Sequence, residues 1–136
     1  MINENIFVFA FAGAIAAAMS DTLSSEIGIL FENTRLITTL DKVEGGTDGG
    51  ITLQGSLAGI IGAFFIGLLT YLVLGIGMDG AIIIGIAGVM GMFGDSILGA
   101  SLEDKWISNE GVNFMATLIG STIAIGGASL VGIVIL

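Results

Sequence analysis

The chain has 136 residues, of which 54% are hydrophobic and only 11% are charged. Soluble domains carry roughly 25% charged residues, so this composition indicates an integral membrane protein. Three Lys and Arg residues against twelve Asp and Glu residues argue against nucleic acid as a partner. The absence of His and Cys excludes imidazole bases, thiol nucleophiles, structural zinc sites and disulfides.

Four apolar stretches are long enough to span a membrane, since a helix needs about 20 residues to cross about 30 Å of hydrocarbon. They cover residues of about 5–26, 55–76, 81–101 and 113–135. The third contains Asp95, whose insertion costs about 2.5–3.5 kcal/mol and is offset by the apolar residues around it. We therefore expect an all-α polytopic membrane protein in which residues 1–136 form one integral membrane domain.

The three basic residues predict the orientation. Arg35 and Lys42 lie between the first and second spans, and Lys105 lies between the third and fourth. With four spans these two loops are on the same side of the membrane, and basic loops face the cytoplasm. We expect cytoplasmic polar loops and both termini outside, in the cell membrane.

The two halves of the chain resemble each other. Residues Met19–Leu23 and Phe93–Ile97 each place a small residue, Asp, a hydroxyl residue and an aliphatic residue in the same order. This pattern favours two parallel helix–loop–helix repeats, although apolar, glycine-rich sequences also match each other by chance. Small residues at helical spacing are expected to mediate helix packing. They are Gly55, Gly59, Gly120, Ala124, Ala128 and Gly132.

The first polar group closes the first span. Asp21, Ser24 and Ser25 share one face of a helix, whereas Glu26 lies about 140° away from Asp21. The two acids converge only if the helix ends or bends here, which Gly28 would permit. The alternative is that these polar residues merely mark the water interface.

The second polar group is the loop Glu44–Gly50, which contains four glycines. Glycines allow successive backbone N–H groups to turn toward one point and bind phosphate. The alternative is a flexible loop, and the segment is not a Walker motif because no Gly-Lys-Ser/Thr follows.

The third polar group is Asp95-Ser96, with Gly99 one turn further on, and it continues to Glu103, Asp104 and Lys105. An ionisable residue inside a membrane span indicates a functional site, and a buried structural hydrogen bond is the alternative. Carboxylates and hydroxyls without His or Cys suit hard cations, above all Mg²⁺.

The motifs together resemble a known membrane family. Their order along the chain is Ala18–Gly28, Arg35–Thr38, Gly46–Gly55, Gly94–Ala100 and Val112–Phe114. This set is similar to the family of the plant phytyl-phosphate kinases and transmembrane protein 19 (domain of unknown function 92), as a short form lacking N-terminal spans. The resemblance implies a kinase that converts a prenyl monophosphate into the diphosphate with CTP and Mg²⁺.

The resemblance also implies roles for individual residues. It gives catalytic and magnesium-binding roles to Asp21, Glu26 and Asp95. The phosphates of substrate and nucleotide would be bound by Arg35, Lys42, Gly46, Thr47, Asp48, Gly49 and Gly50. Three basic residues are few for these phosphates, so we expect a homo-oligomer or a second membrane subunit.

Two functions of other classes compete with the kinase. A transporter or ion-conducting subunit would use the paired Asp-hydroxyl motifs to bind cations, with its carboxylates near the membrane midplane. A purely structural subunit would tolerate Asp95→Asn without loss of activity. Because Asp21 and Asp95 both fall late in their spans, the sequence favours an enzyme at one membrane face.

Overall fold

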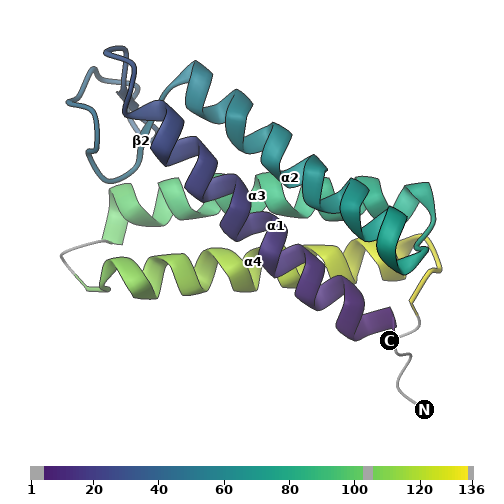
Figure 1. Cartoon of the computed structure of the whole chain (residues 1–136). Coiled ribbons are helices and arrows are strands. Elements are labelled where there is room, and N and C mark those ends of the chain that lie inside the picture. Colours follow the sequence, from purple (N-terminus) through teal and green to yellow (C-terminus); the bar gives the residue numbers. More distant parts are fainter. Residues whose placement is uncertain (1–4, 103–105, 135–136) are drawn as a thin grey trace.

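The computed structural model describes residues 5–102 and 106–134 and forms a four-helix bundle (Figure 1). The helices are α1 (Asn5–Gly28), α2 (Leu53–Leu74), α3 (Met78–Leu102) and α4 (Asn109–Leu130). All four are long and apolar enough to cross a membrane. The all-α membrane fold expected from the sequence is confirmed, with boundaries shifted by a few residues. The fourth span ends earlier than expected, at Leu130, and residue 135 is outside the described chain.

Local signals set the ends of the helices. The Thr52 hydroxyl accepts a hydrogen bond of 3.0 Å from the Gly55 N–H and caps the start of α2. Helix α2 ends at Leu74 and is capped by Gly75, whose φ of 67° lies in the left-handed region; α3 begins at Met78. The short turn makes α2 and α3 antiparallel neighbours.

The connection between α1 and α2 contains a small β-ribbon that was not predicted. Strands β1 (Arg35–Leu36) and β2 (Gly50–Ile51) pair antiparallel, with Arg35 opposite Ile51. Two residues per strand leave no alternating pattern for sequence reasoning to detect. The ribbon lies at one end of the bundle, beside the C-terminal end of α1 (Figure 1).

The helices pack through small residues and present large ones outward. A Cβ on Gly13 of α1 would lie 2.5 Å from the carbonyl oxygen of Gly120 on α4, so these backbones are in close contact. Large side chains such as Phe7, Phe11 and Leu72 are about two-thirds exposed. This arrangement suits a lipid environment, where close van der Waals packing holds helices together.

The small residues predicted to mediate packing do so, with one exception. Gly55, Gly59, Gly120, Ala124 and Ala128 are all buried between helices. Gly132 was wrongly included. It lies beyond the end of α4 with a φ of 75°, and a Cβ there would meet nothing within 4 Å.

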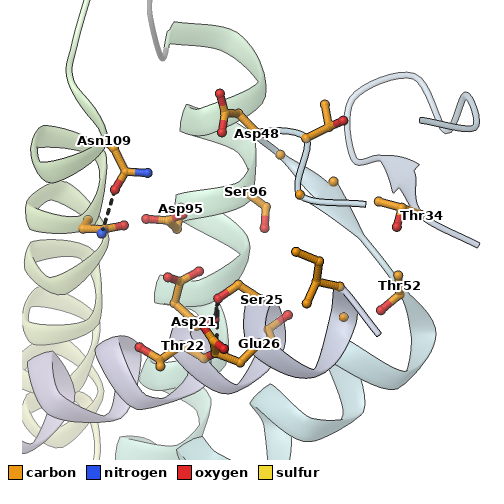
Figure 2. A pocket seen from close by; sticks show the side chains of 18 residues that line it. Asp21, Thr22, Ser25, Glu26, Thr34, Asp48, Thr52, Asp95, Ser96 and Asn109 are labelled. Atoms are coloured by element: carbon orange, nitrogen blue, oxygen red, sulfur yellow. Dashed lines mark hydrogen bonds between the residues drawn. The ribbon is translucent and has the colours of Figure 1, made fainter. Parts of the chain in front are cut away.

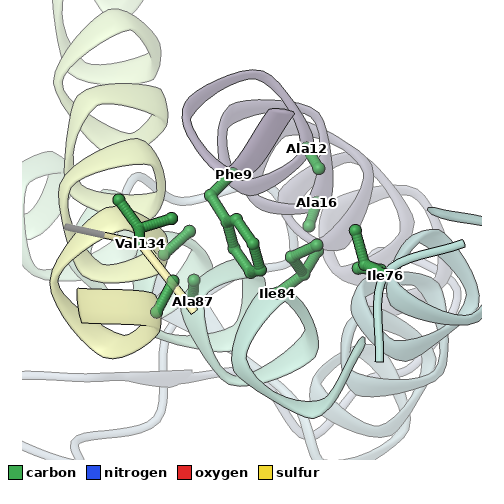
Figure 3. Packing of buried hydrophobic residues seen from close by; sticks show 9 residues of the cluster. Phe9, Ala12, Ala16, Ile76, Ile84, Ala87 and Val134 are labelled. Carbon is green, nitrogen blue, oxygen red and sulfur yellow. The ribbon is translucent and has the colours of Figure 1, made fainter. Parts of the chain in front are cut away.

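An apolar cluster fills the end of the bundle opposite the ribbon (Figure 3). The ring of Phe9 is fully buried against Ile84 and Val134, close to the α2–α3 turn at Ile76. The polar side chains gather at the other end of the bundle, where the ribbon lies.

Helix α1 begins and α4 ends at the same end of the bundle, and the C-terminal ends of α1 and α3 and the starts of α2 and α4 lie at the other (Figure 1). Arg35 and Lys42 are thus on the side predicted to be cytoplasmic, whereas Lys105 lies outside the described residues. The assignment of that side to the cytoplasm remains a prediction.

Candidate functional site

A cavity of about 360 Å³ opens at the ribbon end of the bundle (Figure 2). Its walls come from the C-terminal part of α1, the glycine-rich loop, the last third of α3 and the start of α4. The lining residues are Asp21, Thr22, Ser24, Ser25, Glu26, Gly28, Ile29, Thr34, Gly46, Thr47, Asp48, Gly49, Gly50, Thr52, Asp95, Ser96, Asn109 and Asn113. We call this cavity the polar pocket. It unites the three polar groups that are separate in the sequence.

The polar pocket is rich in carboxylates. Asp21 of α1 and Asp95 of α3 are half-buried in its interior, whereas Glu26 and Asp48 are exposed at its rim. In Figure 2 Asp95 lies between Asp48 above it and Asp21 below it, with Asn109 to the left. Among the residues that the structure describes, which do not include Lys105, none that lines the pocket is a Lys or Arg. The pocket is therefore suited to bind cations or cation-bound phosphates.

Of the two alternatives expected near Glu26, an end or a bend of the helix, the structure shows the end: α1 is regular and stops at Gly28. Gly28 is also used for packing, since a Cβ there would lie 3.1 Å from the Thr52 hydroxyl. The Ser25 hydroxyl donates to the carbonyl oxygens of Asp21 at 3.0 Å and Thr22 at 3.1 Å within the same helix. Glu26 still lines the polar pocket because the loop that follows α1 folds back over the end of the helix.

The glycine-rich loop is docked on α3. Gly49 has a φ of 73°, and a Cβ there would collide with Ala100 and lie 2.6 Å from the Ser96 carbonyl oxygen. The N–H groups of Thr47 and Gly50 close turns onto Glu44 and Thr47 within the loop. Of the backbone N–H groups expected to bind phosphate, these two are therefore already used within the loop.

The remaining N–H groups of the loop are candidates for binding phosphate. Among the described residues, no turn bond uses those of Gly46, Asp48 or Gly49. Gly46 and Gly49 also have positive φ angles, which turn the backbone in a way that side-chain-bearing residues rarely adopt.

Two polar contributors to the pocket were missed by sequence reasoning. Thr34 is 3% exposed and packs beneath the loop, where a Cβ on Gly50 would lie 2.7 Å from its methyl group. Asn109 lies at the start of α4 and accepts a 3.1 Å hydrogen bond from the Asn113 amide. Asn109 and Asn113 are four residues apart and therefore lie on one face of the helix. This spacing was the sequence signal that could have identified Asn109.

Arg35 and Lys42 were predicted to bind phosphate but are not among the lining residues. Both are exposed, and their backbones pair with each other beside the ribbon. The Arg35 guanidinium donates a 2.8 Å hydrogen bond to the Leu40 carbonyl oxygen. Their phosphate-binding role remains a prediction. It would require the segment that carries Arg35 and Lys42 to move toward the pocket.

The pocket fits Mg²⁺ as a partner of bound phosphates. The part of the chain that the structure describes contains no group of three or more His, Cys, Asp or Glu residues positioned to hold a metal by themselves. Mg²⁺ commonly uses only one or two carboxylates and completes its shell with water and substrate phosphates. Asp21 and Asp95 supply that donor set. A single ion held by Asp21, Glu26 and Asp95 together remains a prediction.

Residues 1–121 match the sequence model of the family described as integral membrane protein DUF92. The chain belongs to this family. Every residue that lines the polar pocket falls within the matched part of the DUF92 chain. No solved structure matches the chain significantly.

Relatives of this DUF92 chain occur in archaea, cyanobacteria and plants. It is 50% identical over 125 residues to the uncharacterized membrane protein MJ0933 of Methanocaldococcus jannaschii, covering 89% of this chain and 51% of that protein. It is 37% identical over 119 residues to the uncharacterized membrane protein sll0875 of Synechocystis, covering 85% and 46%. It is 35% identical over 127 residues to the chloroplastic protein VTE6 of Arabidopsis thaliana, covering 90% and 38%. The chain thus spans about half or less of the length of these relatives.

Proposed function

We propose that this DUF92 chain catalyses transfer of the γ-phosphoryl group of CTP to a prenyl monophosphate, giving the prenyl diphosphate and CDP. The observation that carries the proposal is the polar pocket, which combines Asp21, Asp95 and a glycine-rich loop at one end of a membrane bundle. The resemblance of its motifs to those of plant phytyl-phosphate kinases supports the proposal. So does the 35% identity to the chloroplast protein of Arabidopsis.

The reaction requires no general base from the protein. An oxygen of the prenyl monophosphate already carries negative charge and attacks the γ-phosphorus directly. A P–O bond forms there, the bond from the γ-phosphorus to the β–γ bridging oxygen breaks, and CDP leaves with that oxygen. Phosphoryl transfer of this kind depends mainly on positioning and charge neutralisation. A chain without His or Cys can therefore perform it.

Each wall of the polar pocket has a distinct role in this proposal. The N–H groups of Gly46, Asp48 and Gly49 bind the nucleotide phosphates on the loop side. The amides of Asn109 and Asn113 donate hydrogen bonds to the acceptor phosphate on the α4 side. Bound Mg²⁺ would neutralise the phosphate charge between them, held by Asp21 and Asp95.

The electrostatics of the pocket suggest that a further membrane segment completes it. Two phosphate-bearing substrates bring several negative charges into a pocket whose described lining includes four carboxylates and no Lys or Arg. Mg²⁺ offsets part of this charge, and Arg35 and Lys42 are the basic residues nearest in sequence to the glycine-rich loop. We therefore include in the proposal a second copy of this chain, or another membrane subunit, that contributes basic side chains.

The proposal is tested in proteoliposomes that contain this chain alone or with a candidate partner subunit. Label transfer from γ-labelled CTP or ATP to prenyl monophosphates is measured with and without Mg²⁺, and Na⁺ and proton fluxes are measured in the same vesicles. The proposal predicts Mg²⁺-dependent prenyl diphosphate and no flux. Flux without product, in either preparation, would refute the kinase and support a transporter.

A further inference from the structure

A second, smaller cavity of about 80 Å³ lies beside the polar pocket, between α1 and α4. The two cavities share Asp21, Thr22, Asp95 and Asn113, so they are adjacent. Beyond these shared residues the smaller cavity is lined by Ala17, Ala18, Ala116 and Thr117. We call it the α1–α4 crevice.

The geometry of the two helices explains why the crevice exists. Helices α1 and α4 are in close backbone contact at Gly13 and Gly120, and they diverge from there toward the pocket end (Figure 1). Ala17 closes the narrow end, since a Cβ on Gly120 would lie 2.7 Å from its methyl group. The crevice is thus a wedge that widens toward the polar pocket.

The lining of the crevice changes from polar to apolar with distance from the pocket. Asp21, Asp95 and Asn113 lie at the inner end, and alanine methyl groups follow. The Thr117 hydroxyl donates a 2.7 Å hydrogen bond to the Phe114 carbonyl oxygen of its own helix and needs no partner in the crevice. Ala18 is exposed on the outer surface of α1, where lipid surrounds the bundle. The crevice therefore extends from the side chains that it shares with the polar pocket to the outer surface of α1 at Ala18.

The interface between α1 and α2 offers no comparable path. A Cβ on Gly55 of α2 would collide with the Ser24 carbonyl oxygen and lie 2.9 Å from the Gly28 Cα. One turn away, the buried Ser20 hydroxyl donates a 2.9 Å hydrogen bond to the Gly59 carbonyl oxygen. These backbone contacts close that side of the pocket to a hydrocarbon chain.

We propose that the α1–α4 crevice holds the first isoprene unit of a membrane-dissolved prenyl monophosphate. The acceptor phosphate then lies beside Asn113, and the rest of the tail leaves between α1 and α4 past Ala18. The identity of this ligand rests on the function proposed above. The nucleotide enters from the glycine-rich loop, so that donor and acceptor approach Asp21 and Asp95 from opposite sides. This opposite approach is the arrangement that in-line phosphoryl transfer requires.

The first test is photocrosslinking with a geranylgeranyl monophosphate analogue that carries a diazirine on its first isoprene unit. The full chain in proteoliposomes is irradiated without nucleotide, and the labelled peptides are identified by mass spectrometry. The proposal predicts labelling in Ala17–Thr22 and Asn113–Thr117 that unlabelled prenyl monophosphate competes away. Labelling confined to α2, or to the outer groove of α4 at Leu118 and Thr122, would overturn it.

The second test narrows the outer end of the crevice with Ala18→Phe, and Ile15→Phe serves as the control. Ile15 is also exposed on α1 but does not line the crevice. With Ala18→Phe, kcat/KM for geranylgeranyl monophosphate should fall by about tenfold or more, as expected when an apolar tail loses its binding site. Turnover of dimethylallyl monophosphate should change by less than about twofold, because this acceptor has no tail beyond the crevice. Equal losses for both acceptors would overturn the proposal.

The two tests separate this inference from the proposed function. Crosslinks in the crevice without any phosphoryl transfer would retain the lipid-phosphate site and refute the kinase. Transfer with crosslinks elsewhere would retain the kinase and refute the crevice.

Discussion

Replacement of Gly55 by Ala should loosen the contact that holds the wall of the polar pocket together. Gly55 lies in the first turn of α2 and touches α1 through backbone atoms. An added Cβ would collide with the Ser24 carbonyl oxygen and lie 2.8 Å from the Thr52 hydroxyl and 2.9 Å from the Gly28 Cα. Because backbone atoms cannot rotate away, α1 and α2 must separate.

The expected loss of stability follows from two opposing effects. Overpacking a close contact costs about 1–3 kcal/mol. Replacing Gly by Ala in a helix stabilises it by up to about 1 kcal/mol. The free energy of unfolding should therefore fall by roughly 1–2 kcal/mol. Transfer activity should also fall, since Ser24, Gly28 and Thr52 all line the pocket.

The measurement is reversible unfolding in mixed micelles with increasing sodium dodecyl sulfate, followed by circular dichroism. The matched control is Gly126→Ala in α4, where an added Cβ would meet nothing within 4 Å. That substitution should leave activity unchanged and raise the free energy of unfolding by about 0.5–1 kcal/mol. If both variants are equally stable, the close α1–α2 contact does not exist as described.

Three further substitutions test separate parts of the account. Thr52→Val removes the cap of α2 and should cost about 1 kcal/mol in the same unfolding assay; an unchanged midpoint would contradict the cap. Ser20→Ala removes the buried hydrogen bond to α2 and should cost about 0.6 kcal/mol, the average for such bonds in membranes; a loss above about 2 kcal/mol would show a larger structural role. Gly49→Ala should displace the glycine-rich loop from α3 and thereby raise the KM for nucleotide several-fold. The control is Gly75→Ala, because Gly75 has a similar positive φ but no neighbour within 4 Å; this variant should affect stability alone. Equal effects of Gly49→Ala and Gly75→Ala on KM would indicate that loop docking is irrelevant.

Hydropathy was sufficient to predict the four spans because each helix must exceed the thickness of the bilayer. The short ribbon and the route of the loop could not be predicted, since they depend on contacts between distant segments. The close approach of Gly49 to α3 is one such contact.

The carboxylates of the site were predicted, but their grouping was understood only in part. Asp21 and Asp95 were identifiable because charge inside an apolar span is costly and therefore conspicuous. Glu26 was expected to join Asp21 only if α1 ended or bent nearby; the helix ends at Gly28, and both acids line the pocket. Asn109 was missed because a polar residue at a helix start is common and carries no charge.

The most direct test of the central claim is phosphoryl transfer by wild type, Asp21→Asn, Asp95→Asn and Asp79→Asn in matched proteoliposomes. Asp79 is in the first turn of α3, at the opposite end from the polar pocket, and serves as the control. The account predicts Mg²⁺-dependent prenyl diphosphate with wild type and Asp79→Asn, and a loss of at least about 100-fold in both pocket variants. Full activity in either pocket variant, with each protein folded and inserted, would contradict it.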